Sequence, residues 1–244
     1  MIEYLDIMKP GETFYNFLAK HWRTEAGMKL KDKLRPLKHS LVGKNGIYKA
    51  VERANELEAS AGREVTVAFD VGAAIGEAAL PMLRAFPKAN LYCFEPIPYQ
   101  FERLKKRTEA FRNRTQYFNH ALYNKNDEAV FNIWPNHPDG SSFIKEAGSR
   151  EAISVKRRRL DDVIKELNVS HIDFLKIDVE GVEKEVLEGA EKTLKVTDNV
   201  FVEISPLRKG LHSHDYIDAF ELLHRAGFSF EGVYGDYFFT KLLK

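Results

Sequence analysis

Lys176, Asp178 and Glu180 occupy alternate positions where an apolar run ends, in the sequence DFLKIDVEG. On a β-strand this spacing directs the three charged side chains to one side and the intervening apolar side chains to the other. Because buried charges are costly without partners, two interpretations stand: a structural Lys–Asp ion pair, or side chains that converge on a site. Glu203 ends the next predicted strand, NVFVEIS, and favours the site.

A second group of residues follows the apolar run VTVAFDV, in the sequence DVGAAIG. Its glycines, Gly72 and Gly76, do not match the dinucleotide fingerprint G-x-G-x-x-G. A P-loop is also excluded, because it would need Gly-Lys-Ser/Thr where Glu77 and Ala78 stand. An acid, Asp70, followed by two glycines and by another acid at the end of the next strand suits a cofactor without phosphates. S-adenosylmethionine is such a cofactor.

Each part of S-adenosylmethionine has a candidate partner here. The small residues at 72–76, which include Ala73 and Ala74, allow close approach to the backbone. Helix N–H groups that begin near Gly76 favour the carboxylate of the ligand, and Asp70 faces its ammonium group. Glu95, 19 residues beyond Gly76 and just before Pro96, is placed to accept both ribose hydroxyls. The alternative is a purely structural role, in which residues 72–76 form a tight strand-to-helix turn that binds no ligand.

The elements that must position these residues alternate between strand and helix from Glu64 onward. The predicted strands lie at 64–72, 89–96, 115–123, 171–181 and 199–205, with two extra strands at 128–134 and 152–160. The predicted helices lie at 77–86, 97–111, 160–167, 182–194 and 215–227. A final pair of strands at 228–243 surrounds Gly235-Asp236, a plausible hairpin turn. This order predicts an α/β fold with a doubly wound, mostly parallel sheet that ends in an antiparallel hairpin.

The first 62 residues have a different character and predict a helical N-terminal extension to a domain at 63–244. Helical spacing of apolar residues is found at 12–22 and 46–60. Residues 20–49 hold nine Lys or Arg against two acids, and KRRR follows at 156–159. These basic runs leave open an alternative substrate, RNA or a phosphorylated molecule.

Bulk composition excludes several classes of protein. The formal charge of the 244 residues is +1, so no global field selects nucleic acid or membrane. The single cysteine, Cys93, cannot form an internal disulfide and lies in an apolar run, which predicts a reducing, cytoplasmic setting. No signal peptide and no apolar run of roughly 20 residues is found, so we expect a soluble protein with no membrane span.

Six sequence blocks together resemble the FkbM-like family of S-adenosylmethionine-dependent methyltransferases. They are FDVGAAIGEAAL, YCFEPIPYQFERLKK, NHALYNKNDEAVF, DGSSF, RRRLDDVI and IDFLKIDVEGVEKEVLEGAEKTL. The resemblance spans about Val65 to Ile204 and is most specific from Lys176 to Glu183. It implies the seven-stranded, Rossmann-like class I methyltransferase fold. It also implies O-methylation of a hydroxyl on a sugar, glycan or natural-product-like acceptor.

The same resemblance implies roles for individual residues. Asp70, Gly72 and Gly76 would form the cofactor loop, and Glu95 would bind the ribose. Residues Asn119, His120 and Ala121 would lie against the adenine, and Asp178 and Glu180 would face the acceptor. The chain departs from the family pattern at Ala74, where Asn is usual, and at Val182, where Ala is usual.

Methyl transfer to a hydroxyl needs positioning and a base that removes the proton. Asp178 is the first choice for this base, with Glu180 orienting the substrate or Lys176; His120 and His137 are the alternatives.

No metal is predicted. Asp178, Glu180 and Glu203 nevertheless leave open a site for Mg²⁺, and His212 and His214 have ligand-like spacing without a third ligand. The alternative from another class is a cofactor-binding interaction module without catalysis.

Overall fold

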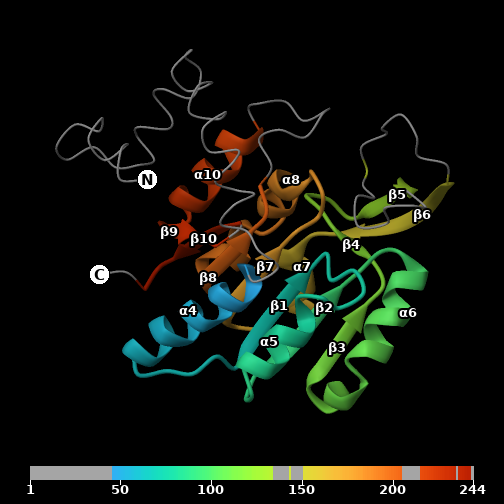
Figure 1. The fold of residues 1–244 in the computed structure, drawn as a ribbon. Helices are drawn as coiled ribbons and strands as arrows, with labels where there is room; N and C mark the ends of the chain where they lie inside the picture. Colours follow the sequence, from blue (N-terminus) through green and yellow to red (C-terminus); the bar gives the residue numbers. More distant parts are fainter. Residues whose placement is uncertain (1–45, 134–142, 144–150, 205–214, 235, 243–244) are drawn as a thin grey trace. The chain divides into compact units, whose positions relative to one another are not determined.

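Seven strands of the chain form one twisted sheet in the order β3-β2-β1-β7-β8-β10-β9 (Figure 1). The computed structural model describes residues 46–133, 143, 151–204, 215–234 and 236–242. The strands are β1 (Val67–Val71), β2 (Asn90–Phe94), β3 (Thr115–Phe118), β7 (Ile172–Ile177), β8 (Thr197–Val202), β9 (Ser229–Val233) and β10 (Tyr237–Thr240). All pairings are parallel except those of β10 with β8 and with β9. The predicted doubly wound sheet with a terminal antiparallel hairpin is therefore confirmed.

The strand order reverses between β1 and β7, which lie side by side. In this pairing Asp70 of β1 is in register with Lys176 of β7. In open parallel sheets ligands bind outside the carboxyl ends of the strands at such a switch point. The sheet topology thus brings the two sequence groups that were singled out for their chemistry to the same edge.

A second, smaller sheet has the order β4-β6-β5, with strands β4 (Ala121–Leu122), β5 (Asp127–Ile133) and β6 (Glu151–Arg158). It contains the two extra strands that the sequence predicts. The single strand predicted at 115–123 is wrong, because the chain leaves the main sheet after Phe118. The side-chain amide of Asn119 donates to the carbonyls of Glu95 and Pro96, and β4 then pairs with β6.

Helices cover both faces of the main sheet. They are α4 (Gly46–Ser60), α5 (Ala79–Ala85), α6 (Pro98–Arg107), the 3₁₀ helix at Glu109–Arg114, α7 (Leu160–Glu166), α8 (Glu183–Glu188), α9 (Glu191–Lys195) and α10 (Asp215–Arg225). The helix predicted at 46–60 is confirmed, and the one predicted at 12–22 lies outside the described residues. Among the described helices, none is long and apolar enough to cross a membrane.

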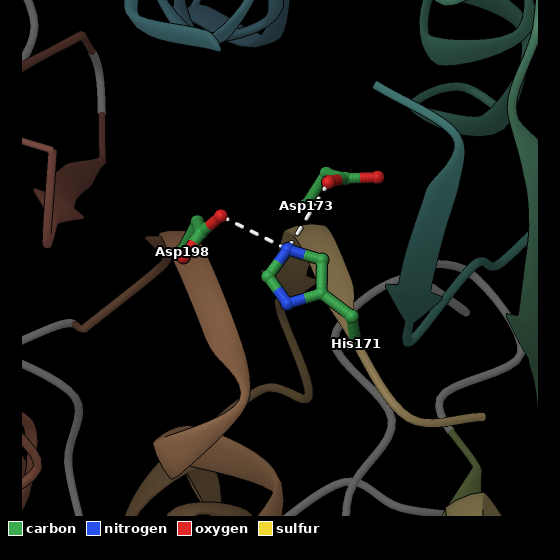
Figure 2. Close-up of side chains that lie close together, drawn as sticks. All are labelled: His171, Asp173 and Asp198. Carbon is green, nitrogen blue, oxygen red and sulfur yellow. Dashed lines mark ion pairs between the residues drawn. The ribbon is translucent and has the colours of Figure 1, made fainter. Parts of the chain in front are cut away.

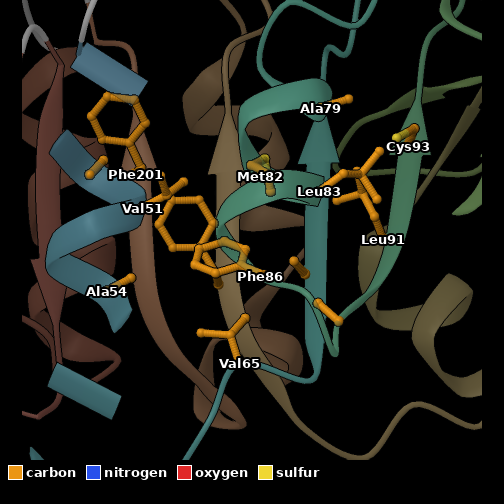
Figure 3. Close-up of a cluster of buried hydrophobic side chains, with 14 of the residues drawn as sticks. Val51, Ala54, Val65, Ala79, Met82, Leu83, Phe86, Leu91, Cys93 and Phe201 are labelled. Carbon is orange, nitrogen blue, oxygen red and sulfur yellow. The ribbon is translucent and has the colours of Figure 1, made fainter. Parts of the chain in front are cut away.

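Helices α4 and α5 pack together against strands of the sheet (Figure 3). Val51 of α4, Met82 of α5 and Phe86, which follows α5, are almost wholly buried in one cluster with Leu91 of β2 and Phe201 of β8. Burying such side chains stabilises the fold by about 1.5–3 kcal/mol each. The amphipathic residues of α4 therefore belong to the same core as the sheet that carries the site. The domain boundary at residue 62 remains a prediction.

The prediction of one continuous helix at 182–194 is wrong, because this segment forms two short helices, α8 and α9. Its interruption falls at Gly189, where a Cβ atom would lie 2.0 Å from the backbone oxygen of Tyr123. The chain from the small sheet crosses the helix at this position, and only glycine leaves room for it. Helix α8 ends there, with the Gly189 N–H donating to the carbonyl of Glu185.

Candidate active site

The loop after β1 is held against the end of β2 by its own backbone. The N–H groups of Gly72 and Ala73 both donate to the carbonyl of Phe94, each at 3.0 Å. Three residues of this loop have positive φ angles: Gly72 (76°), Ala74 (46°) and Gly76 (87°). Glycine adopts this conformation at little cost. The prediction that the helix begins near Gly76 is wrong, because turns occupy residues 74–78 and α5 begins at Ala79.

Gly72 is the point of closest approach between the loops after β1 and β7. A Cβ atom on Gly72 would lie 1.8 Å from the backbone oxygen of Asp178. The N–H of Asp178 in turn donates to the carbonyl of Val71 at 3.0 Å. The two loops therefore form one packed unit, and the glycine is required by space as well as by its backbone angle.

Glu95, at the end of β2, points its carboxylate into this unit. Its Oε2 accepts the N–H of Ala74 at 2.9 Å and its Oε1 accepts the N–H of Ile97 at 2.7 Å. The residue is 4% exposed. Burial raises the pKa of Glu95 to about 7, against the opposing effect of the two backbone hydrogen bonds. The carboxylate is thus fixed in direction, and its charge changes near neutral pH.

Lys176 lies between two carboxylates at the switch point. Its Nζ is 3.1 Å from Asp70 Oδ1 and 3.3 Å from Asp178 Oδ2, and it donates to the carbonyl of Gly72 at 2.8 Å. Burial alone would lower the pKa of Lys176, but Asp178 and Asp70 outweigh it and raise the pKa well above its usual value. Lys176 therefore stays protonated and cannot serve as a base. The predicted Lys–Asp ion pair is therefore present, and that these side chains form a site remains a prediction.

Asp70 is fully buried, and apart from the Lys176 ion pair neither of its carboxylate oxygens has a hydrogen-bond partner among the described residues. Burial raises the pKa of Asp70, and the Lys176 ammonium opposes that shift. A buried acceptor without its full set of hydrogen bonds is costly, so a ligand with a positively charged donor would suit this position.

On the other side of Lys176, Asp178, Glu180 and Glu203 bring carboxylate oxygens within 4.8 Å of one another. The side chain of Asp178 is 34% exposed and so can be reached by a substrate. Burial, the charges of Asp178 and Asp236 and a hydrogen bond with Asp178 raise the pKa of Glu203 to about 9. Because the two carboxyl groups are coupled, the proton held here at neutral pH belongs to the pair of Asp178 and Glu203.

Glu183 is a residue that the sequence analysis did not single out. It is buried, and its Oε1 accepts the N–H of Gly181 at 2.9 Å and of Val179 at 3.3 Å. It thereby holds the turn in which Glu180 has a φ of 58° and Gly181 a φ of 109°. Burial raises the pKa of Glu183 to about 7. The spacing E-G-V-E, with an acid just after a glycine turn, was the available signal.

The three residues expected near the adenine behave differently from one another. The Asn119 side chain is engaged by backbone carbonyls, as described above, and Ala121 lies in β4. His120 contacts the rings of Phe94 and Phe118 edge-on, and its Nε2 is buried without a hydrogen-bond partner among the described residues. Burial, with the nearby charges of Arg158 and Lys156, lowers the pKa of His120 to about 4. The imidazole is neutral at pH 7 and offers an unused polar atom.

The basic run KRRR at 156–159 is largely neutralised by acids. Arg157 makes two hydrogen bonds with Asp127, at 2.6 and 2.7 Å. Arg158 pairs with Glu166, and Arg159 lies 3.4 Å from Asp161. This arrangement disfavours the run as a phosphate-binding surface. The residues His137, His212 and His214 lie outside the described residues.

The strand order, the Gly72 loop and Glu95 at the end of the second strand define a class I methyltransferase fold. The model of the Methyltransferase FkbM domain matches residues 70–230. The chain therefore belongs to the FkbM methyltransferase family and is a methyltransferase.

Individual relatives and solved structures were also found. The 2-O-methyltransferase NoeI of Sinorhizobium fredii is 32% identical over 196 residues, which cover 70% of this chain and 77% of NoeI. The hexuronic acid methyltransferase AglP of Haloferax volcanii is 30% identical over 141 residues, 58% of this chain and 56% of AglP. A solved structure with a similar fold is fibrillarin of Aeropyrum pernix, which was crystallised with S-adenosyl-L-methionine. It is 14% identical, the match covers 80% of this chain and 75% of the fibrillarin chain, and the TM-score is 0.45.

Proposed function

We propose that this methyltransferase uses S-adenosylmethionine to methylate a hydroxyl oxygen of a sugar, glycan or natural-product-like acceptor. The observation that carries the proposal is the arrangement around Lys176. One protonated side chain separates a buried acid, Asp70, which faces the cofactor side, from a reachable acid, Asp178, on the acceptor side. Two relatives support this acceptor class: NoeI is named as a 2-O-methyltransferase and AglP as a hexuronic acid methyltransferase.

The residues of the Gly72 side fit the cofactor. Asp70 has unused acceptor capacity for the ammonium group, and each oxygen of Glu95 keeps a lone pair for a ribose hydroxyl beyond the backbone N–H that it already accepts. The neutral His120 offers Nε2 to the edge of an adenine ring. When bound, the sulfonium of the cofactor supplies an already activated methyl group.

The acceptor side supplies the base. Asp178 lies 3.3 Å from the Lys176 ammonium, and a nearby opposite charge favours the ionised form of a carboxyl group. We therefore assign to Asp178 the role of taking the proton of an acceptor hydroxyl. Such a placed base contributes about 10²–10⁴-fold in rate. Glu180, on a strained turn held by Glu183, is in place to orient the acceptor. Lys176 acts as a positioning residue for both acids rather than as a proton carrier.

Calorimetric titration of the full chain tests the cofactor assignment. We expect S-adenosylmethionine and its demethylated product to bind and NAD not to bind. Glu95→Ala should weaken both sulfur ligands by at least about tenfold, because a charge-assisted hydrogen bond is worth about 1.5–3 kcal/mol. Glu102→Ala, which removes an exposed acid from α6, is the matched control. If neither sulfur compound binds the wild type, the proposal fails.

The alternative of an interaction module without catalysis is tested by Asp178→Asn. An enzyme should lose turnover of sugar acceptors and keep its affinity for the cofactor, whereas a binding module has no turnover to lose. A screen of hydroxylated sugars with the wild-type chain provides the acceptor. If no member of several acceptor classes is methylated while the cofactor binds, the interaction module becomes the better explanation.

A further inference from the structure

The opposite, amino-terminal edge of the sheet carries a second group of metal-ligating side chains. His171 precedes β7, Asp173 lies in β7 and Asp198 lies in the neighbouring strand β8 (Figure 2). Three potential ligand atoms, one from each residue, lie within 4.8 Å of one another. From these residues we infer a binding site for one divalent transition-metal ion of the zinc type. This inference does not depend on the proposed function.

The distances between the ligand atoms suit a small metal ion. His171 Nε2 lies 2.9 Å from Asp198 Oδ2 and 3.2 Å from Asp173 Oδ1. In a tetrahedral zinc site with bonds of about 2.0–2.1 Å, neighbouring ligand atoms are separated by about 3.3 Å. Yet His171 Nε2 is buried without a hydrogen-bond partner among the described residues. The contacts of His171 Nε2 with Asp198 and Asp173 are therefore short, but neither has the geometry of a hydrogen bond. This is expected when the nitrogen points between the two carboxylate oxygens and not directly at one of them.

The two carboxylates are held by a second layer of hydrogen bonds. Asp173 Oδ2 accepts the N–H of Thr66 at 2.7 Å, the hydroxyl of Thr66 at 3.0 Å and the N–H of Val67 at 2.8 Å. Its other oxygen, Oδ1, is the one that faces His171. Asp198 Oδ2 accepts from the Arg63 guanidinium at 2.6 Å. Such outer-layer partners orient ligands in metal sites.

The local charge also favours a bound cation. Arg63 lies 3.0 Å from the fully buried Glu58 and also pairs with Asp198, so two carboxylates share one guanidinium. The Lys241 ammonium interacts with Asp198 at longer range, but its hydrogen bond is to the carbonyl of Leu194. Among the described residues no Lys or Arg is paired with Asp173, whose charged neighbour is His171. A cation bound between Asp173 and Asp198 would therefore be favoured.

The ligand set selects the class of metal. One imidazole with two carboxylates suits Zn²⁺ or a similar transition ion better than Mg²⁺ or Ca²⁺, which prefer oxygen ligands alone. The His171 side chain is 40% exposed, so water can complete the coordination. Because the three ligands join β7 to β8 at the edge away from the active site, the ion would stabilise the sheet without taking part in methyl transfer.

Zinc titration of the full chain by calorimetry, with metal content measured after desalting, tests the site. We expect one zinc equivalent to be lost in His171→Ala and retained in His224→Ala, which removes an exposed imidazole from α10. Asp178→Asn controls for the acidic cluster of the active site. The melting temperature of the wild type should rise with zinc, and that of His171→Ala should not.

A second variant protects the test against misfolding. Asp198→Asn keeps the shape of the side chain and should weaken zinc binding at least about tenfold. Circular dichroism establishes that each variant is folded before its stoichiometry is compared. The inference is overturned if the wild type binds no zinc at about 100 µM, or if folded His171→Ala and Asp198→Asn bind as much zinc as the wild type.

Discussion

Strands β7 and β8 have carboxylates near both of their ends. The basic side chain that lies beside these carboxylates differs between the two ends. At the carboxyl end Lys176 stands 3.1 and 3.3 Å from two acids. At the amino end His171 stands 2.9 and 3.2 Å from two acids. The ammonium is a cation in this setting, whereas the nitrogen of an imidazole can serve as a metal ligand.

This difference sets what each end can do. Lys176 is a cation of the chain itself, and it balances Asp70 and Asp178 without a metal ion. At the amino end Arg63 balances Asp198 only in part, because it also pairs with Glu58. Under the two proposals above, the carboxyl end serves chemistry on a substrate and the amino end holds the strands together through a metal ion.

Among the variants that test this comparison, the largest expected effect is a loss of turnover. Asp178→Asn should lower kcat for the best acceptor of the sugar screen by about 10²–10⁴-fold, because the base is lost. The dissociation constant of S-adenosylmethionine should change by less than about threefold. Initial rates and calorimetry measure both quantities. Glu128→Gln, an exposed acid on β5, is the control, and activity above about a tenth of wild type in Asp178→Asn would contradict the assignment.

Removal of the built-in cation should mainly affect stability. Lys176→Met leaves Asp70 and Asp178 without their counter-charge, and breaking a buried ion pair costs about 3–5 kcal/mol. Urea unfolding measures the loss. The comparison variant is Lys88→Met, whose pair with Glu64 is exposed on both sides and which should lose less than about 1 kcal/mol. Equal losses in the two variants would show that Lys176 is not a central counter-ion.

The pH dependence of cofactor binding gives a smaller, directional effect. The pKa of Glu95 is raised from 4.5 to about 7 by burial, and the ribose hydroxyls need the ionised form. Below about pH 7 binding must first expel a proton, so the dissociation constant of S-adenosylmethionine should rise by up to about tenfold per pH unit. Above that pH it should level off. Calorimetry between about pH 5.5 and 8.5 measures the curve, and Glu95→Gln should flatten it.

The smallest effect is expected at the amino end. Thr66→Val removes one of the three hydrogen bonds to Asp173 Oδ2 and should cost about 1 kcal/mol in urea unfolding. Zinc affinity should fall by about tenfold, because an outer-layer partner is lost, while kcat stays at the wild-type value. A fall in kcat that matches the loss of zinc would mean that the two ends of the strands are coupled.

Much of the fold follows from local sequence patterns. Continuous apolar runs bounded by glycine, proline or acids identified the parallel strands, and helical spacing identified α4 and α10. The strand predicted at 115–123 and the helix predicted at 182–194 are wrong for a common reason, which is contact with distant parts of the chain. Asn119 turns the chain because its amide meets carbonyls at the end of β2, and Gly189 interrupts a helix because the backbone of Tyr123 crosses it. No local pattern contains either contact.

The same distinction applies to the candidate site. Lys176, Asp178 and Glu203 were predictable as one group, because strand period and sheet edge follow from sequence. The restraint of Glu180 by Glu183 was not predicted, because it depends on the path of a turn. The His171 group was missed because Asp198 lies more than twenty positions beyond His171 and Asp173 and meets them only through the register of β7 with β8.

The contact between Gly72 and the backbone of Asp178 has a consequence for exchanging parts between relatives. Since a single added carbon would lie 1.8 Å from the Asp178 carbonyl oxygen, neither loop can change its path without the other. A chimera that imports the segment after β7 to acquire a new acceptor must also import the segment after β1. We therefore expect that exchanging only one of the two segments creates a steric clash, whereas exchanging both together can preserve the contact.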